Sequence, residues 1–80
     1  MTLGDAFGKR LKKLMAKYNV SQYRLMKDTG LTSSALEHTR RLGAKNVFLL
    51  TVARISKYLG ITLQEFFDDP IFDLSQFDLE

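Results

Sequence analysis

Residues 21–41, SQYRLMKDTGLTSSALEHTRR, carry the start and stop signals of two short helices joined at a glycine. Ser21 suits a helix N-cap, because its hydroxyl accepts a hydrogen bond from a free amide of the first turn. Thr32 repeats this signal eleven residues later. Gly30 stands between them, where a helix ends in the left-handed conformation that glycine adopts without a Cβ clash. The stretch therefore predicts one helix on each side of Gly30.

Apolar residues around both caps support this interpretation. Val20 and Leu25 flank the first cap, and Leu31 and Leu36 flank the second, at the two positions of a hydrophobic staple. We predict helices at about residues 22–29 and 33–41. Two helices joined by a glycine turn at this spacing form the helix-turn-helix pattern, whose second helix enters the major groove of DNA.

Helical periodicity continues on both sides of this pair. A first helix is predicted at about residues 5–18, with one apolar face and basic side chains over the remaining surface. A fourth is predicted at about 47–59, and a fifth begins at the capping box of Thr62 and Glu65. The expected core faces comprise Phe7, Leu11, Leu14, Met15 and Tyr18 in the first helix and Val52, Ile55 and Leu59 in the fourth. The sequence thus predicts an all-α, five-helix domain over residues 1–69.

The last eleven residues, PIFDLSQFDLE (70–80), form a short acidic and apolar tail. Their alternation of side-chain types predicts short strands or an extended peptide outside the helical body. Three roles stay open for the tail: packing on its own domain, pairing across a dimer, or binding another protein. We treat it as a candidate association segment.

Composition limits the classes of protein. The 80 residues include no cysteine and no evident cluster of metal ligands, so we expect an apolar core without disulfide, metal or cofactor. The N-terminus has no long apolar run, which predicts neither a signal peptide nor a membrane span and favours a soluble, cytoplasmic protein. Residues 1–67 hold twelve basic and four acidic side chains, a net charge of +8, whereas residues 68–80 hold five acidic ones. A body so basic favours a polyanionic partner, although solubility alone is an alternative explanation.

Residues 21–41 resemble the motif of the lambda-repressor-like (Xre/Cro) helix-turn-helix proteins. The matching residues are Ser21, Gln22, Leu25, Gly30, Leu31, the polar run 32–34 and Leu36. Residues 51–67, TVARISKYLGITLQEFF, are similar to the fourth and fifth helices of that family, so the resemblance covers about residues 5–67. The departures are Met26 and Thr39, where the family usually has alanine and an aliphatic residue, and Met15 and Arg40, where it often pairs arginine with glutamate. Because the arginine and the glutamate of this pair are both absent, neither is left partly buried without its partner, and the expected fold is unchanged.

The resemblance implies that the second helix of the motif reads DNA bases. Its outward face, away from the core residue Leu36, carries the expected base contacts Ser33, Ser34, Glu37 and His38. Serine bonds to several base edges, and glutamate accepts a hydrogen bond from cytosine N4. A local alternative stays open, because Ser34 and Glu37 also have the spacing of a capping box.

Phosphate contacts are expected at helix N-termini, whose free amides and dipole favour anions, and in the loop after the second helix. The resemblance implies that Gln22 anchors the DNA backbone and that the loop 42–46 lies along the same backbone. The full expected set is Ser21, Gln22, Thr32, Arg41, Lys45 and Asn46. The alternatives are an ordinary exposed glutamine at position 22 and a helix-dipole role for the arginines.

The fourth helix and the tail hold more apolar residues than one core face can bury. The expected association surface comprises Phe48, Leu49, Phe72, Leu74 and Phe77. An enzyme is not expected, because one histidine, no cysteine and no glycine-rich phosphate loop leave few catalytic arrangements. The leading hypothesis is a regulator of transcription that binds double-stranded DNA by sequence, more often a repressor in this family, and acts as a homodimer. If the protein is prokaryotic or comes from a phage, it would associate with the nucleoid. The alternative is a protein-interaction module on the same scaffold, antitoxin-like or a regulatory subunit, working through the tail.

Overall fold

The computed structural model describes residues 3–32 and 45–77. In these ranges the order of elements is α1 (Leu3–Tyr18), α2 (Gln22–Thr29), α4 (Lys45–Leu59) and α5 (Leu63–Phe66), followed by the 3-10 turns η1 (Pro70–Phe72) and η2 (Leu74–Gln76). Every regular element of the described part is helical, which confirms the all-α prediction. The predicted helix at 33–41 lies outside the described residues.

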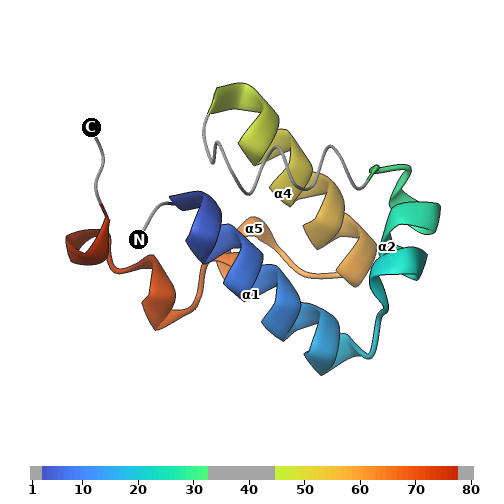
Figure 1. Ribbon diagram of the computed structural model, residues 1–80, viewed down its shortest axis with the longest axis horizontal. Coiled ribbons are helices and arrows are strands. Elements are labelled where there is room, and N and C mark those ends of the chain that lie inside the picture. The colour runs from blue at the N-terminus through green and yellow to red at the C-terminus, as the bar shows by residue number, and fades with distance from the viewer. Residues whose placement is uncertain (1–2, 33–44, 78–80) are drawn as a thin grey trace.

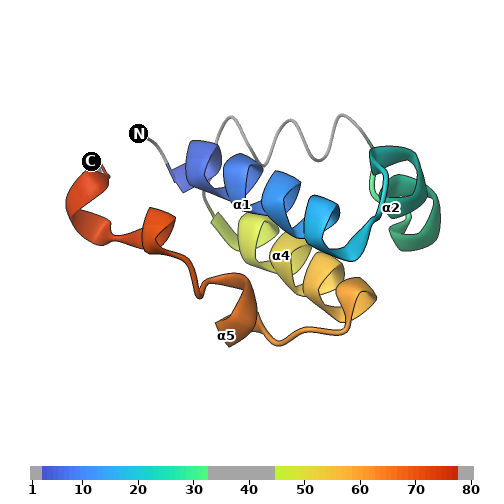
Figure 2. The same cartoon turned by 90° about the horizontal axis from the view of Figure 1, so that it is seen from below.

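The helices enclose one small core. Helices α1 and α4 run side by side in both views, with α2 at their C-terminal end, and the chain after α5 returns toward the N-terminus (Figures 1 and 2). The buried core residues are Phe7, Leu11, Leu14, Leu25, Leu31, Val52, Ile55 and Phe66. The apolar face of α1 is narrower than predicted, because Met15 is only half-buried and Tyr18 is 38% exposed. None of the described helices is long and apolar enough to cross a bilayer.

The helix ends follow the local signals in the sequence. The Ser21 hydroxyl accepts a hydrogen bond of 3.2 Å from the Arg24 amide and caps α2. Gly30 ends α2 at φ 76°, in the left-handed region. The capping box of α5 is complete, because Thr62 and Glu65 each accept the other's amide at 3.0 Å. Both caps and the bounds of α2 are therefore confirmed.

Helix α4 begins at Lys45, two residues before the predicted start. The prediction that Lys45 and Asn46 lie in a loop is therefore wrong. Neither residue type breaks a helix, so nothing in the local chemistry stops α4 from extending through them. Helix α1 likewise begins two residues earlier than predicted, at Leu3.

The tail forms two 3-10 turns rather than the predicted strands or extended peptide. Asp69 accepts a hydrogen bond from the Ile71 amide at 2.9 Å, and Asp73 accepts one from the Ser75 amide at 3.1 Å. Aspartates that bond to the backbone two residues on initiate turns, and Pro70 supplies the φ angle that the first turn needs. The alternating aspartates were turn signals and not the polar face of a strand.

The first turn of the tail packs on the tail's own domain. Phe72 lies edge-on to Phe67, with ring centroids 5.0 Å apart, and 6.4 Å from the buried ring of Phe66. Turn η1 also contacts α1. The expectation of a tail outside the helical body therefore fails for η1. Leu74 of η2, by contrast, is 66% exposed.

Candidate nucleic-acid interface

The N-terminus of α2 presents a run of solvent-exposed polar side chains. Ser21 and Gln22 are exposed, as contact with a phosphate requires, and so is Thr32 beyond the turn. Tyr23 and Arg24 lie beside them, and Tyr23 is 68% exposed. Tyr23 and Arg24 were not among the predicted contacts, although their place in the first turn beside Gln22 could have indicated them. Hydroxyl, amide and guanidinium donors here adjoin helix amides that have no partner within the helix.

Several expected contacts lie outside the described residues. These are the base contacts Ser33, Ser34, Glu37 and His38 and the phosphate contact Arg41. For Lys45, Asn46 and Phe48 the description covers the helical backbone of α4 and not the side chains. Their roles stay predictions.

The turn after α2 is held by its backbone, a side chain and the core together. The Gly30 amide donates to the Met26 carbonyl at 2.9 Å. The Thr29 hydroxyl donates to the Leu25 carbonyl and accepts from the Leu31 amide at 3.2 Å. Leu31 is itself buried, at 6% exposure. These contacts fix the place from which the chain leaves toward residue 33.

Tyr58 of α4 reaches the same end of α2. Its hydroxyl donates to a carboxylate oxygen of Asp28, with 2.6 Å between the two oxygens. This hydrogen bond, together with partial burial and the nearby negative charge, raises the pKa of the Tyr58 phenol above 10.0. The phenol is therefore protonated at neutral pH and stays a donor. No local pattern in the sequence indicates this role for Tyr58, because its partner is thirty positions away.

Basic side chains cover the described helices, but not all of them are available to DNA. The exposed ones are Lys9, Lys12, Lys13 and Lys17 on α1, Arg24 and Lys27 on α2, and Arg54 and Lys57 on α4. Arg10 differs, since its side chain is only 13% exposed. It donates from Nε to the Phe66 carbonyl at 2.7 Å and from a terminal nitrogen to the Glu65 carbonyl at 2.8 Å. This arginine is engaged with the end of α5 and is not part of a free basic face.

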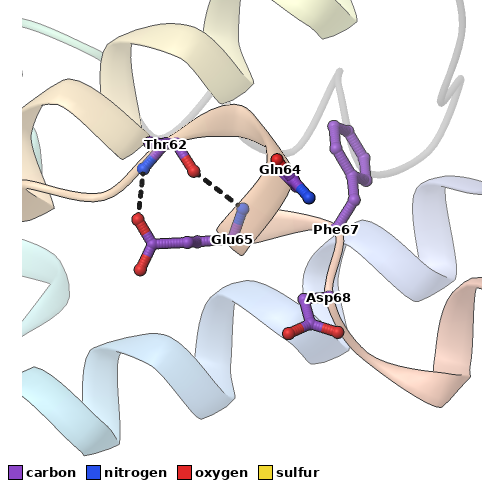
Figure 3. Close-up of a pocket in the computed structure, with 5 residues that line it drawn as sticks. All are labelled: Thr62, Gln64, Glu65, Phe67 and Asp68. Carbon is purple, nitrogen blue, oxygen red and sulfur yellow. Dashed lines mark hydrogen bonds between the residues drawn. The ribbon is translucent and has the colours of Figure 1, made fainter.

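A shallow hollow of about 470 Å³ lies on the outer side of α5. Figure 3 shows its lining residues, which are Thr62, Gln64, Glu65, Phe67 and Asp68. Two carboxylates at this hollow make it unsuited to phosphate, because like charges repel at close range. Nor do the described residues include a group of three or more side chains that could hold a metal ion.

The expected association surface divides into exposed and partly covered residues. Leu49 and its neighbour Leu50 on α4 are 53% and 54% exposed, and Leu74 is exposed in the tail. Phe72 and Phe77 are half-buried. Leu49 and Leu74 are therefore available to a partner, whereas Phe72 already packs against aromatic residues of its own domain.

Comparison with known proteins agrees with this architecture. The family model of the Cro/C1-type helix-turn-helix DNA-binding domain matches residues 10–70, about three quarters of the chain. The match runs from α1 through α2 and its turn to the start of η1. No curated protein and no solved structure matches the chain. A match over this range, with the capped α2 and glycine turn in place, shows that the chain belongs to the Cro/C1-type helix-turn-helix DNA-binding family.

Proposed function

We propose that this protein is a transcriptional regulator, a repressor, that binds double-stranded DNA by sequence through residues 33–41 in the major groove. The observation that carries the proposal is the exposed N-terminus of α2, which the Ser21 cap holds at one end of the helix while the turn at Gly30 ends the helix at the other. In this geometry α2 anchors on phosphates and directs the following segment at the bases. Ser33, Ser34, Glu37 and His38 make the base contacts, and Gln22, Arg41, Lys45 and Asn46 hold the backbone.

Selection of bound sequences from a random duplex pool tests sequence recognition directly. The expected result is a defined operator that the protein binds more tightly than a scrambled duplex of the same length. Ser34→Ala and His38→Ala should each relax discrimination at one or two base pairs, by about 1–3 kcal/mol. A selection that returns no preferred sequence would contradict the proposal.

Two exposed glutamines form a matched pair for testing the phosphate anchor. Gln22 is the first residue of α2, and Gln64 is the second residue of α5. Gln22→Ala should weaken binding to every duplex about three- to tenfold, as expected for the loss of one solvent-exposed hydrogen bond. Gln64→Ala should leave binding unchanged. Equal effects of the two substitutions would remove Gln22 from the interface.

The cationic contacts are distinguished by their salt dependence. Arg41→Ala and Lys45→Ala should weaken binding nearly uniformly across sequences, and each should reduce the magnitude of the salt slope by about 1. Gln22→Ala removes no charge and should leave that slope unchanged. An unaltered slope in the Arg41 or Lys45 variant would show that the residue does not neutralise a phosphate.

The regulator acts as a dimer in this proposal, because Leu49, Leu50 and Leu74 are exposed on a small domain. Half-sites in a selected operator should lie about 34 Å apart. Leu49→Ser and Leu74→Ser change exposed residues, so they should shift the mass in sedimentation toward monomer without unfolding the domain. Removal of residues 70–80 is a less clean test, since it also removes Phe72 from its aromatic contacts. An unchanged mass, or an operator with one unrepeated half-site, would contradict the dimer.

A second candidate is a protein-interaction module, and the exposure of Leu74 on a defined turn favours it. The two functions differ in their response to salt. Binding to DNA that weakens steeply with added salt supports the regulator. No DNA binding at low salt, with capture of one protein partner that Leu74→Ser abolishes, supports the module.

A further inference from the structure

The hydrogen bond between Tyr58 and Asp28 joins the two helices on either side of the undescribed segment. Asp28 is the second-last residue of α2, and Tyr58 is the second-last residue of α4. The Tyr58 ring is half-buried against the core cluster. Packing restricts such a ring to few rotamers, so its hydroxyl is a nearly fixed point on α4. Through that point the core determines where the C-terminal end of α2 lies.

Asp28 begins a chain of contacts through the turn. The next residue, Thr29, bonds through its hydroxyl to the Leu31 amide, and Gly30 bonds back to the Met26 carbonyl. Leu31 then enters the core. Release of Asp28 from Tyr58 would free the last turn of α2 while leaving the Ser21 cap at its other end intact. The direction of the chain toward residue 33 could then vary relative to the anchor at the α2 N-terminus.

We propose that Tyr58 is a positioning residue for DNA recognition, acting through Asp28 to hold the turn from which the base-reading segment leaves. This inference rests on the proposed function and adds a residue that touches no DNA. A side chain in this role determines where the base contacts lie relative to the phosphate contacts at the α2 N-terminus. Phosphate contacts position a protein on any duplex, whereas base contacts alone distinguish sequences. Loss of the Tyr58 hydroxyl should therefore reduce specificity and leave general affinity intact.

Tyr58→Phe is the direct test, because it removes the hydroxyl and keeps the packed ring. The readout is the ratio of dissociation constants for a scrambled duplex and the selected operator, at one salt concentration. We expect this ratio to fall about five- to tenfold, the contribution of one solvent-exposed hydrogen bond. The affinity for scrambled duplex and the salt slope should stay at their wild-type values, since no cation is lost.

Variants of Asp28 test whether specificity depends on the carboxylate oxygen that accepts the hydrogen bond from Tyr58. Asp28→Asn keeps an oxygen acceptor and should retain the specificity ratio. Asp28→Ala removes the acceptor and should lower the ratio as Tyr58→Phe does. The double variant with Tyr58→Phe should show no further loss, because both substitutions remove one shared interaction. Additive losses would show that the two residues act separately and would overturn the inference.

Two control variants separate positioning from stability. Tyr18→Phe removes a hydroxyl from an exposed tyrosine at the end of α1, which lines a hollow together with Glu65 and Asp68. Thr62→Ala breaks the capping box of α5 and should lower the stability of the domain. Both should keep the wild-type specificity ratio. If Thr62→Ala lowers the ratio as much as Tyr58→Phe, Tyr58 contributes only to stability and the inference is wrong.

Hydrogen exchange tests the turn without DNA. Tyr58→Phe should speed exchange of the Gly30 and Leu31 amides and leave the Glu65 amide in α5 unchanged. Unchanged exchange at Gly30 and Leu31 would overturn the inference. A wild-type protein that binds operator and scrambled duplex equally would overturn the proposed function, and with it the recognition role of Tyr58. A discriminating wild type whose Tyr58→Phe variant discriminates equally would overturn this inference alone.

Discussion

Two long-range junctions hold this chain together, and they differ in strength. In the α1–α5 junction, Arg10 donates to the Glu65 and Phe66 carbonyls and pairs with Asp69 at 3.3 Å. In the α2–α4 junction, Tyr58 donates to Asp28 at 2.6 Å. The first uses three hydrogen bonds from a side chain that is 13% exposed, whereas the second uses one bond at the surface. The first junction therefore contributes more to stability, whereas the second holds the turn that leads to the proposed DNA-reading segment.

The α1–α5 junction also closes the chain end to end. Helix α5 is one turn long, so its last carbonyls accept no hydrogen bond from within the helix. The guanidinium of Arg10 donates hydrogen bonds to two of them. Beneath it the buried rings of Phe7 and Phe66 stack with centroids 6.0 Å apart. The polar and apolar contacts thus support the same union of α1 with α5.

The largest expected effect is that of Arg10→Ala on the free energy of unfolding. The substitution removes the side-chain donor of the Phe66 carbonyl. The Glu65 carbonyl and the Asp69 carboxylate each lose one of several donors, so we expect a loss of about 2–3 kcal/mol. Denaturant unfolding measures this loss. Lys12→Ala, at an exposed position on the same helix, should change stability by less than about 0.5 kcal/mol. If Arg10→Ala instead lowers DNA specificity at unchanged stability, the two junctions are not separate in function.

Phe72→Ala should have the next largest effect and belongs to the same junction. Its ring is half-buried against Phe66 and Phe67, so we expect a loss of about 1–2 kcal/mol, below the value for a fully buried phenylalanine. Leu74→Ala serves as the control, because Leu74 is 66% exposed and should contribute little. Equal unfolding curves for the two variants would show that the tail does not dock in solution.

Local sequence signals predicted the parts of this fold that local chemistry decides. The Ser21 cap, the Gly30 turn and the Thr62–Glu65 box depend on residues within four positions of each other, and the structure contains all three. The start of α4 was missed because no strong cap precedes Lys45 in the pattern. The tail was misinterpreted because an aspartate every few residues also suits an alternating strand.

Neither junction could be predicted from the sequence. Arg10 and Phe66 are 56 positions apart, and Tyr58 and Asp28 are 30 positions apart. Arg10 was one of several basic residues on a helix face, and nothing local distinguishes it from Lys9 or Lys12. Arg10 reaches the Glu65 and Phe66 carbonyls only because α1 packs beside α5. At the candidate site, the predicted contacts Ser21 and Gln22 are exposed at the α2 N-terminus, and their contact with phosphate stays a prediction. The sequence did not indicate Tyr58, which bonds to the other end of α2.

Ser56→Ala should change stability in the opposite direction. Ser56 is 3% exposed, and its hydroxyl has no hydrogen-bond partner among the described residues. Removing an unsatisfied buried hydroxyl and adding a better helix former should stabilise the domain by about 1 kcal/mol. The melting temperature should rise while DNA specificity stays constant, because Tyr58 keeps its place on α4. A loss of stability would show that the hydroxyl bonds to a group outside the described part of the chain.

The smallest expected effect is a difference in pH dependence between the junctions. A hydrogen bond from Lys13 at 2.8 Å, a second from the Ile71 amide and the charge of Arg10 hold the pKa of Asp69 below its usual 3.8. The unfolded chain therefore takes up this proton first as pH falls. The contribution of Asp69 to stability is complete above pH 3.8 and is lost as pH falls through the folded pKa. We expect less than about 1 kcal/mol, because Lys13 is 67% exposed and water screens the pair.

The α2–α4 junction should instead weaken in alkali. The raised pKa of Tyr58 means that its contribution is present below 10.0 and is lost as pH rises through the folded pKa, where the phenolate can no longer donate to Asp28. Unfolding of wild type and Asp69→Asn should therefore differ at pH 7 and converge only as pH falls below 3.8, through the folded pKa of Asp69. Wild type and Tyr58→Phe should differ at pH 7 and converge well above pH 10. Convergence of both pairs at the same end of the pH scale would contradict this assignment, because an acid-labile carboxylate and an alkali-labile phenol cannot fail together.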